Sequence, residues 1–276
     1  MNRSTEVLNS QLGTYTRNAT AADVPLCPLC RTELAPDSSH CRSCQRLLAV
    51  PGAVPDRVGF GIYAVGGQQT GYMMRNYKNV GGQQTGYMMR NYKNGVLNRD
   101  YGQVRALLAE MLQHNACLAA LSGTPISAIT YIPSLSHPSH RYHALAHILG
   151  DMVRALPALA GLTRLHLRPT TVPHQAHQIA GSGSLTVKEG NGEWGHVLVV
   201  DDTWTTGASV GDATLTLRAA GAAMVSSLLV ARWINEKYSR ALTASLVRRK
   251  TFDSRTCPWT PSGQCPPPGP HPAGGR

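Results

Sequence analysis

Two adjacent carboxylates and a run of small hydroxyl residues stand together in VLVVDDTWTTGASVGD, residues 197–212. The four apolar residues at its start predict a short buried strand, and Asp201 and Asp202 follow directly after them. The next residues, 205–209, are small and carry hydroxyl groups. A strand that leads into such a loop and then into a helix forms an anion site, because loop amides and the helix N-terminus point at the ligand. The segment therefore predicts a phosphate site with two carboxylates beside it.

The loop and the aspartates suit different parts of one ligand. Carboxylates repel a phosphate but accept hydrogen bonds from vicinal hydroxyls, as an acidic residue does for ribose in dinucleotide folds. We therefore expect Asp201 and Asp202 to bind the 2- and 3-hydroxyls of a ribose 5-phosphate. The 5-phosphate would bind to Thr205, Thr206, Gly207, Ala208 and Ser209. The alternative is a helix cap or turn after a strand, although a cap needs only one Asp.

A second set of candidate residues lies near the N-terminus, in the pairs CPLC and CRSC. Four thiolates from two such pairs can bind a tetrahedral Zn²⁺, here through Cys27, Cys30, Cys41 and Cys44. The module, residues 23–50, is too short to bury a core of its own, so the metal would stabilise its fold. A disulfide or redox pair is the alternative. We expect Cys117 to be a small core residue, and Cys257 and Cys265 to lie in a tail without a partner.

Strands and helices alternate along the rest of the chain. Apolar periodicity predicts helices from residue 103 and over 145–156. Buried strands are predicted at 126–132, 197–200 and 224–233, with a further strand at 162–168. This order favours an α/β fold in which helices cover a parallel sheet, and ligands of such sheets bind at the carboxyl ends of the strands.

Composition divides the chain into five parts. These are a disordered tail (1–22), the zinc module (23–50), a linker (51–100), the α/β domain (101–250) and a Pro-rich disordered tail (251–276). Within the linker, VGGQQTGYMMRNYKN at 65–79 is repeated letter for letter at 80–94. We expect the second copy to be built into the fold and the first to form a loop.

Charge and hydropathy limit the setting of the protein. The 276 residues carry a formal net charge of +11, which favours acidic partners such as phosphates or nucleic acid. No apolar run approaches the roughly 18 residues of a membrane span, and the N-terminus lacks a secretory signal. We expect a cytoplasmic protein, and a reducing compartment favours metal binding by the CxxC pairs.

The stretch VLVVDDTWTTGAS resembles the phosphoribosyl-diphosphate (PRPP) motif of type I phosphoribosyltransferases. With the four-cysteine module in front, the chain resembles the ComF-like branch of that family. The resemblance implies a Rossmann-like parallel-sheet domain behind a zinc module. It implies binding of PRPP with Mg²⁺ and a transferase activity, in which the phosphoribosyl group passes to a nitrogen nucleophile and diphosphate is released. Catalytic residues would be Asp201, Asp202 and Arg141, and Ser134 and Lys93 would contact PRPP.

A non-catalytic accessory factor in DNA uptake or nucleic-acid handling is the alternative function. It is favoured by the basic charge and by residues 140–143, HRYH, which depart from the run that ComF-like proteins show in the diphosphate loop. The nitrogen acceptor is left open, and nucleic acid and a second copy of the chain are further candidate partners.

Overall fold

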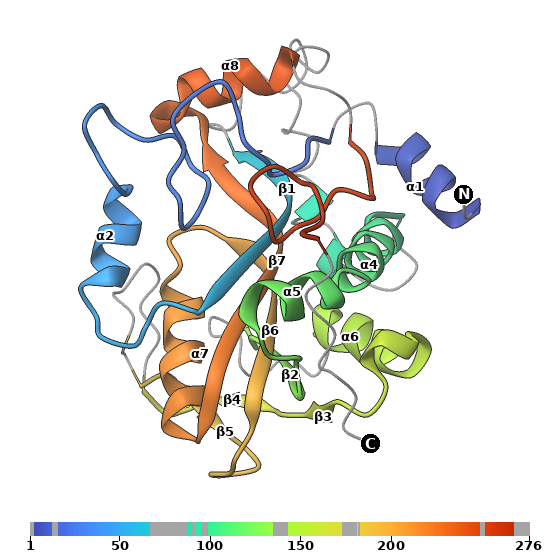
Figure 1. The fold of residues 1–276 in the computed structure, drawn as a ribbon, viewed down its shortest axis with the longest axis vertical. Helices are drawn as coiled ribbons and strands as arrows, with labels where there is room; N and C mark the ends of the chain where they lie inside the picture. The colour runs from blue at the N-terminus through green and yellow to red at the C-terminus, as the bar shows by residue number, and fades with distance from the viewer. Residues whose placement is uncertain are drawn as a thin grey trace.

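The computed structural model describes residues 3–12, 16–66, 88–89, 92–94, 99–134, 143–172, 181, 183–248 and 252–267. Its centre is a five-stranded sheet with the strand order β1-β7-β6-β2-β3 (Figure 1). All neighbouring strands in it are parallel. The strands are β1 (Arg57–Gly66), β2 (Ala128–Tyr131), β3 (Thr163–Arg164), β6 (Gly195–Trp204) and β7 (Ala222–Asn235). The predicted α/β fold with a parallel sheet is confirmed.

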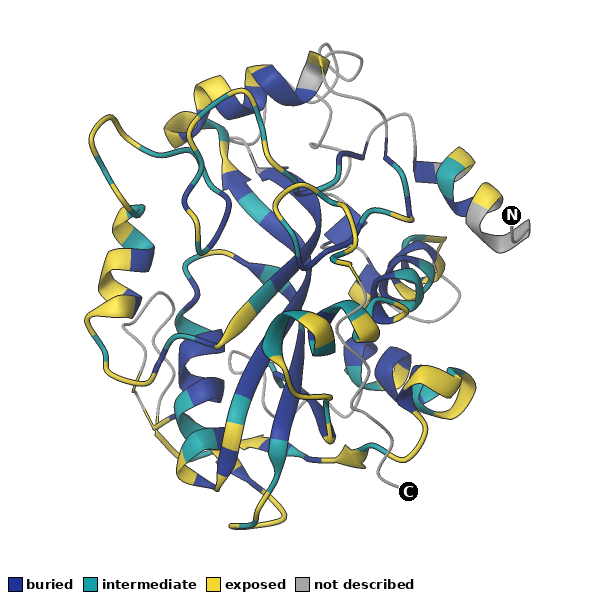
Figure 2. Ribbon diagram, viewed as in Figure 1, coloured by how far each residue is buried: buried dark blue, intermediate teal, exposed yellow. Residues whose placement is uncertain are grey.

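Helices and loops cover both faces of this sheet, and each face has its own apolar cluster. One cluster contains residues of α4 (Arg99–Leu112), α5 (Asn115–Ser122) and α6 (Ala144–Ala155). The other contains residues of α7 (Ala208–Ala219) and of the cysteine module, which ends in α2 (Arg42–Leu48). Alternate residues of β6 point into the two clusters, and Figure 2 shows β1, β6 and β7 buried along most of their length.

Smaller elements complete the described chain. They are α1 (Arg3–Leu12), η1 (Tyr92–Asn94), η2 (Pro157–Leu159), the antiparallel pair β4 (Leu167–Pro169) and β5 (Leu185–Val187), η3 (Glu236–Tyr238) and α8 (Arg240–Arg248). Of the helices that the structure describes, none has the length and apolar character needed to cross a bilayer.

The predicted linker at 51–100 is wrong in its first part, because residues 57–66 form the edge strand β1. Two glycines, Gly59 and Gly61, interrupt the pattern of side chains from which this strand could have been predicted. A Cβ on Gly59 would lie 2.8 Å from the ring of Trp259, and one on Gly61 would lie 2.6 Å from the sulfur of Met111. The glycines therefore let distant side chains pack directly on the strand backbone.

The prediction that residues 1–22 are disordered is also wrong for the residues described. Leu8 and Leu12 of α1 are buried in the core. Further on, Asn18 forms an antiparallel bridge with Ile62, and the Ala19 amide donates to the Gly61 carbonyl at 3.0 Å. This segment is ordered because it forms hydrogen bonds with the outer edge of β1. Its own polar sequence does not predict that contact.

The C-terminal segment differs from its prediction in the same way. Residues 252–267 of the expected disordered tail, 251–276, are packed on the core, and Phe252, Cys257 and Trp259 are buried. The Pro258 carbonyl accepts a hydrogen bond from the Phe60 amide at 3.1 Å. The prolines that suggested disorder thus shape a loop that lies against β1.

The second copy of the repeat contributes to the core, as expected. Met88, Met89 and Tyr92 are buried and belong to the cluster around α4 and α6. The first copy begins with Val65 and Gly66 at the end of β1, and its remaining residues lie outside the described part of the chain.

Candidate functional site

The sheet has one topological switch point, between β2 and β6. From β2 the chain runs through α6 to β3 on one side, and from β6 it runs through α7 to β7 on the other. The carboxyl ends of the strands at such a switch point, here the ends of β2 and β6, are where open α/β sheets bind their ligands. Among the described strands, these two ends carry the predicted Ser134 and the pair Asp201 and Asp202.

The two aspartates lie within β6, which continues to Trp204 instead of ending at Val200 as predicted. Asp201 pairs in register with Leu229 of β7. Neighbouring residues of a strand point to opposite faces, so the two carboxylates diverge. Asp202 is only 9% exposed. Its side chain lies on the face covered by α4 and α6, as its contacts with η1 show.

Two residues of the second repeat hold the Asp202 carboxylate. The Tyr92 hydroxyl donates to its Oδ2 at 2.8 Å, and the Lys93 ammonium lies 2.6 Å from the same atom. Burial lowers the pKa of Lys93, but the nearby carboxylates outweigh this and raise it on balance. Lys93 therefore keeps its positive charge beside Asp202. The sequence predicted Lys93 but missed Tyr92, whose signal was its position next to the lysine in NYKN.

Asp201 differs electrostatically from its neighbour. Its Oδ1 accepts a hydrogen bond from the Asp202 amide at 2.8 Å. Burial, and then the charge of Asp202, raise the pKa of the Asp201 carboxyl well above its usual range. A carboxyl that retains its proton more readily can donate to a hydroxyl oxygen and repels a neighbouring phosphate less than a carboxylate does.

The loop after Trp204 ends at the N-terminus of α7, as the sequence predicted for residues 205–209. Gly207 takes the N-cap position in the left-handed conformation, with φ 89°, and no side chain caps the helix. The Ala208 amide contacts the Thr206 hydroxyl at 3.5 Å. Among the residues that the structure describes, none accepts a hydrogen bond from the amides of Gly207, Ser209 or Val210. These amides and the positive end of the helix can bind an anion.

The chain after β2 forms the other wall of this candidate site. The Ile132 amide donates to the Val200 carbonyl at 3.2 Å, so the partly buried Ser134 follows β2 beside the end of β6. The other predicted residue of this wall, Arg141, lies outside the described residues, as do all of 135–142.

His143 is a residue of this wall that the sequence did not single out as a site residue. It caps α6, its Nδ1 accepts from the Ala146 amide at 3.4 Å, and its ring centre lies 5.1 Å from that of Tyr131. Burial lowers its pKa, while the charge of Asp202 raises it and that of Lys93 lowers it. The sequence feature that could have identified His143 is its position at the start of the helix that follows β2.

The four predicted cysteines of the module converge. Their sulfur atoms all lie within 4.8 Å of one another, and the Cys30 and Cys41 sulfurs are 3.5 Å apart. Four sulfurs at the usual Zn–S distance of about 2.3 Å span tetrahedral edges of about 3.8 Å. The group therefore fits a structural metal ion such as zinc.

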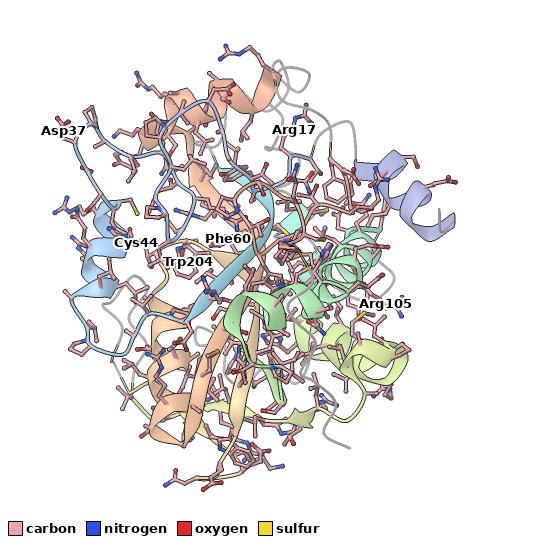
Figure 3. All side chains as sticks on the ribbon, viewed as in Figure 1. Arg17, Asp37, Cys44, Phe60, Arg105 and Trp204 are labelled. Atoms are coloured by element: carbon pink, nitrogen blue, oxygen red, sulfur yellow. The ribbon has the colours of Figure 1, made fainter. Side chains whose placement is uncertain are left out.

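One arginine, which the sequence did not single out, joins the cysteine module to the loop of residues 205–209, which we call the anion loop after the ligand we expect there. Arg232 of β7 is buried, and its guanidinium lies 3.4 Å from the Cys30 sulfur. The same side chain donates to the carbonyls of Cys30 at 2.7 Å, Trp204 at 3.0 Å and Thr205 at 3.2 Å. Figure 3 shows Cys44 close to Phe60 and Trp204, and all three belong to one apolar cluster. The module thus supports the loop from behind.

A separate cavity of about 450 Å³ lies along α7, β5 and the residues that flank β5. Its lining runs from Asp212 toward the end of the helix at Ala220 and includes neither Asp201 nor Asp202. The Asp212 carboxylate accepts hydrogen bonds from the Gly181 amide and the Ser184 hydroxyl. Asp212 therefore holds the chain before β5 by hydrogen bonds, and the cavity is separate from the switch point between β2 and β6.

No protein-family model matches this chain, and no curated protein matches it. Its function is therefore inferred from the geometry of its own residues.

Proposed function

We propose that the protein binds PRPP at the switch point between β2 and β6 and transfers its phosphoribosyl group to a nitrogen nucleophile. One observation carries this proposal. The paired acids Asp201 and Asp202 lie near the end of β6, and the loop that follows leads to amides at the start of α7 that have no acceptor among the described residues, at the switch point of a parallel sheet. A sugar diol next to a phosphate monoester is the ligand chemistry that this combination suits.

Each part of PRPP then has a candidate partner. The amides of Gly207 and Ser209 and the hydroxyls of the loop bind the 5-phosphate. Asp201 and Asp202 are the proposed partners of the ribose hydroxyls, and one of the two carboxylates must turn from its own face of β6 to reach the same sugar as the other. The ammonium of Lys93, which is 57% exposed, has the freedom to turn from Asp202 toward the diphosphate. Ser134 and Arg141 are the proposed contacts of the diphosphate from the loop after β2.

The reaction breaks the bond between ribose C1 and the diphosphate oxygen and forms a bond between C1 and nitrogen. The electron pair of the broken bond leaves with diphosphate, and the proton displaced from nitrogen passes to solvent. Mg²⁺ bound to the diphosphate would disperse the charge of this leaving group. The protein contributes by orienting the sugar and by placing acidic groups near the positive charge that develops at C1, so it needs no covalent nucleophile.

The cysteine module fits this function as a support. We propose that Cys27, Cys30, Cys41 and Cys44 bind one structural Zn²⁺ as thiolates, and that the protein works in the cytoplasm, where a reducing environment keeps such thiols free of disulfides. The Arg232 guanidinium would donate to the Cys30 thiolate and fix the loop carbonyls at the same time. Outer contacts of this kind orient the ligands of a metal and raise its affinity.

Calorimetry with PRPP, with and without Mg²⁺, tests the proposal. We expect the wild-type chain to bind PRPP and the Asp201→Asn/Asp202→Asn variant to lose at least tenfold in affinity. Asp151→Asn is the matched control, because this exposed carboxylate lies on α6 and pairs with Arg154. Absence of wild-type binding, or equal binding by the double variant, would refute the PRPP site.

The nucleic-acid alternative is favoured by the net charge of +11 and by the departure at residues 140–143 described above. Arg42 and Arg46 of α2 are exposed on the outer side of the module. Affinity for single-stranded DNA is measured against salt in the wild type and in Arg42→Glu/Arg46→Glu. A steep salt dependence that this variant removes, in a protein that does not bind PRPP, would favour the alternative.

A further inference from the structure

A second cluster of metal-binding side chains is separate from the predicted module. His114, Cys117, Cys257 and Cys265 each bring one ligand atom to within 4.8 Å of the others. The His114 Nδ1 lies 3.5 Å from the Cys265 sulfur and 3.7 Å from the Cys117 sulfur. From the sequence, Cys117 was expected to be a core residue, and the two later cysteines were expected to lie unpartnered in a tail. Cys117 is partly buried against the core, as expected, whereas the prediction for the two later cysteines is wrong, because Cys257 is buried and Cys265 contacts His114.

Two short segments, well separated in the chain, build the cluster. His114 lies at the turn between α4 and α5, and Cys117 is in the first turn of α5. The other segment is the loop Cys257–Cys265, which lies beside β1 in Figure 1. This loop is closed by a 2.8 Å bond from the Cys257 amide to the Gly263 carbonyl and by a 2.7 Å bond from the Thr260 hydroxyl to the Gln264 carbonyl.

We propose that these four residues form a second metal site, a Cys₃His site for Zn²⁺. At Zn–N of about 2.05 Å and Zn–S of about 2.3 Å, a tetrahedral site has N···S edges of about 3.6 Å. The two measured N···S distances lie on either side of this value. Three thiolates and one imidazole are soft and borderline ligands, which select zinc over calcium or magnesium.

A disulfide explains the cluster less well. A disulfide would join two of the three cysteines. It would not explain why the imidazole nitrogen lies from both the Cys117 and the Cys265 sulfurs at the spacing of two ligands of one metal ion. A metal uses all four groups. It also accounts for the spacing His-x-x-Cys at 114–117, which presents two ligands from one turn of chain.

The proposed metal fastens the C-terminal loop to the body of the protein. This loop places Trp259 on Gly59 of β1, and its Pro258 carbonyl accepts from the Phe60 amide. Arg31 of the cysteine module donates to the same carbonyl at 2.9 Å. The loop thus lies between the two metal groups, and the second metal would hold its far end against α4 and α5.

Metal analysis of the purified full chain tests the proposal by elemental mass spectrometry. We expect two zinc ions per chain in the wild type and one in each of Cys265→Ser and His114→Ala. Cys44→Ser should lose the other ion and keep this one. His40→Ala is the control, because His40 neighbours Cys41 outside the four-cysteine group, and it should keep two. His114→Cys retains four ligands and should also keep two, with the cobalt-substituted protein showing stronger thiolate-to-metal absorption than the wild type.

A single wild-type zinc ion that Cys265→Ser leaves in place would overturn the proposal. Thiol titration in denaturant with chelator separates a metal site from a disulfide. The chain has seven cysteines, so we expect seven thiols, whereas a disulfide would remove two of them from the count and would contradict the proposal. If Cys265→Ser fails to fold, Cys265→His keeps a ligand at the same position. That variant is expected to fold with two ions, and one ion in it would count against the site. Neither result bears on PRPP binding, which is measured separately.

Discussion

Gly207 is the residue on which the anion loop depends most directly, and Gly207→Ala tests that dependence. Gly207 has φ 89° at the N-cap of α7. A Cβ there would lie 2.4 Å from Cζ2 of Trp204, a side chain that is 1% exposed. The indole also packs edge-on against Phe60 with ring centres 5.7 Å apart, so it has little room to move.

The cost of this substitution has two sources. A left-handed backbone costs a residue with a Cβ about 1–2 kcal/mol. Forcing an extra carbon into a packed core costs about 1–3 kcal/mol more. We therefore expect Gly207→Ala to lower the free energy of unfolding by about 2–5 kcal/mol and to weaken PRPP binding, because the loop amides must shift.

Urea denaturation followed by circular dichroism measures the first effect. Gly102→Ala is the control, because Gly102 lies in α4 and a Cβ added to it would have nothing within 4 Å. That change should stabilise the protein by about 0.5–1 kcal/mol. Trp204→Phe should relieve part of the clash, so its effect and that of Gly207→Ala should not add. A loss below about 1 kcal/mol for Gly207→Ala would refute the close packing described for this turn.

Buried polar groups support three more predictions. Tyr92→Phe removes a 2.8 Å bond to a buried carboxylate and should cost about 1.5–3 kcal/mol in denaturation, whereas Tyr238→Phe, at a 74% exposed residue, should cost nothing measurable. Arg232→Lys should lower the metal affinity of the four-cysteine group about 10–100-fold in competition with a chelator, because an ammonium cannot replace all the guanidinium contacts. Burial lowers the pKa of His196, so the unfolded chain binds its proton more readily and stability should fall as the pH drops below about 6.5. The slope from this one group is at most about 1.4 kcal/mol per pH unit, and His196→Gln should reduce the slope measured by urea denaturation across pH 5–7.

Each of these predictions has a result that contradicts it. Equal stability of Tyr92→Phe and the wild type would mean that the Asp202 carboxylate does not need this donor. Unchanged metal affinity in Arg232→Lys would mean that the Arg232 contacts do not couple the cysteine module to the anion loop. An acid-induced loss of stability that is the same in His196→Gln would assign the proton uptake to other groups, His143 among them.

The parts of the site that the sequence predicted are those encoded locally. The apolar run, the aspartates and the small loop are contiguous, so their order alone places carboxylates and helix amides at one end of a strand. The cysteine module is equally local, because two CxxC pairs bring four thiolates within reach of one ion. What the local pattern did not reveal is the direction of the two carboxylates, since the strand continues through them.

The missed features depend on contacts between distant segments. In β1, Gly59 leaves room for Trp259, which lies near the other end of the chain, so the sequence of the strand carries no alternation to read. Residues 18–19 are ordered by the edge of the same strand. The cysteines at 257 and 265 acquire a role only beside His114. Propensity and periodicity report neighbours in sequence, whereas these contacts join residues that are far apart in it.

The long-range contacts also couple the cysteine module to the sheet and its loops. Arg31 connects the module to the C-terminal loop through Pro258, and Arg232 connects it to the anion loop through Trp204 and Thr205. Both guanidinium groups are buried, and a buried charge is costly unless its partners stay in place. If the four thiolates lost their metal and separated, Arg232 would lose its partner at Cys30, and the carbonyls of the anion loop would lose a fixed donor. Removal of the metal should therefore weaken binding at the N-terminus of α7 before the sheet unfolds, and this coupling gives a structural module an effect on the site.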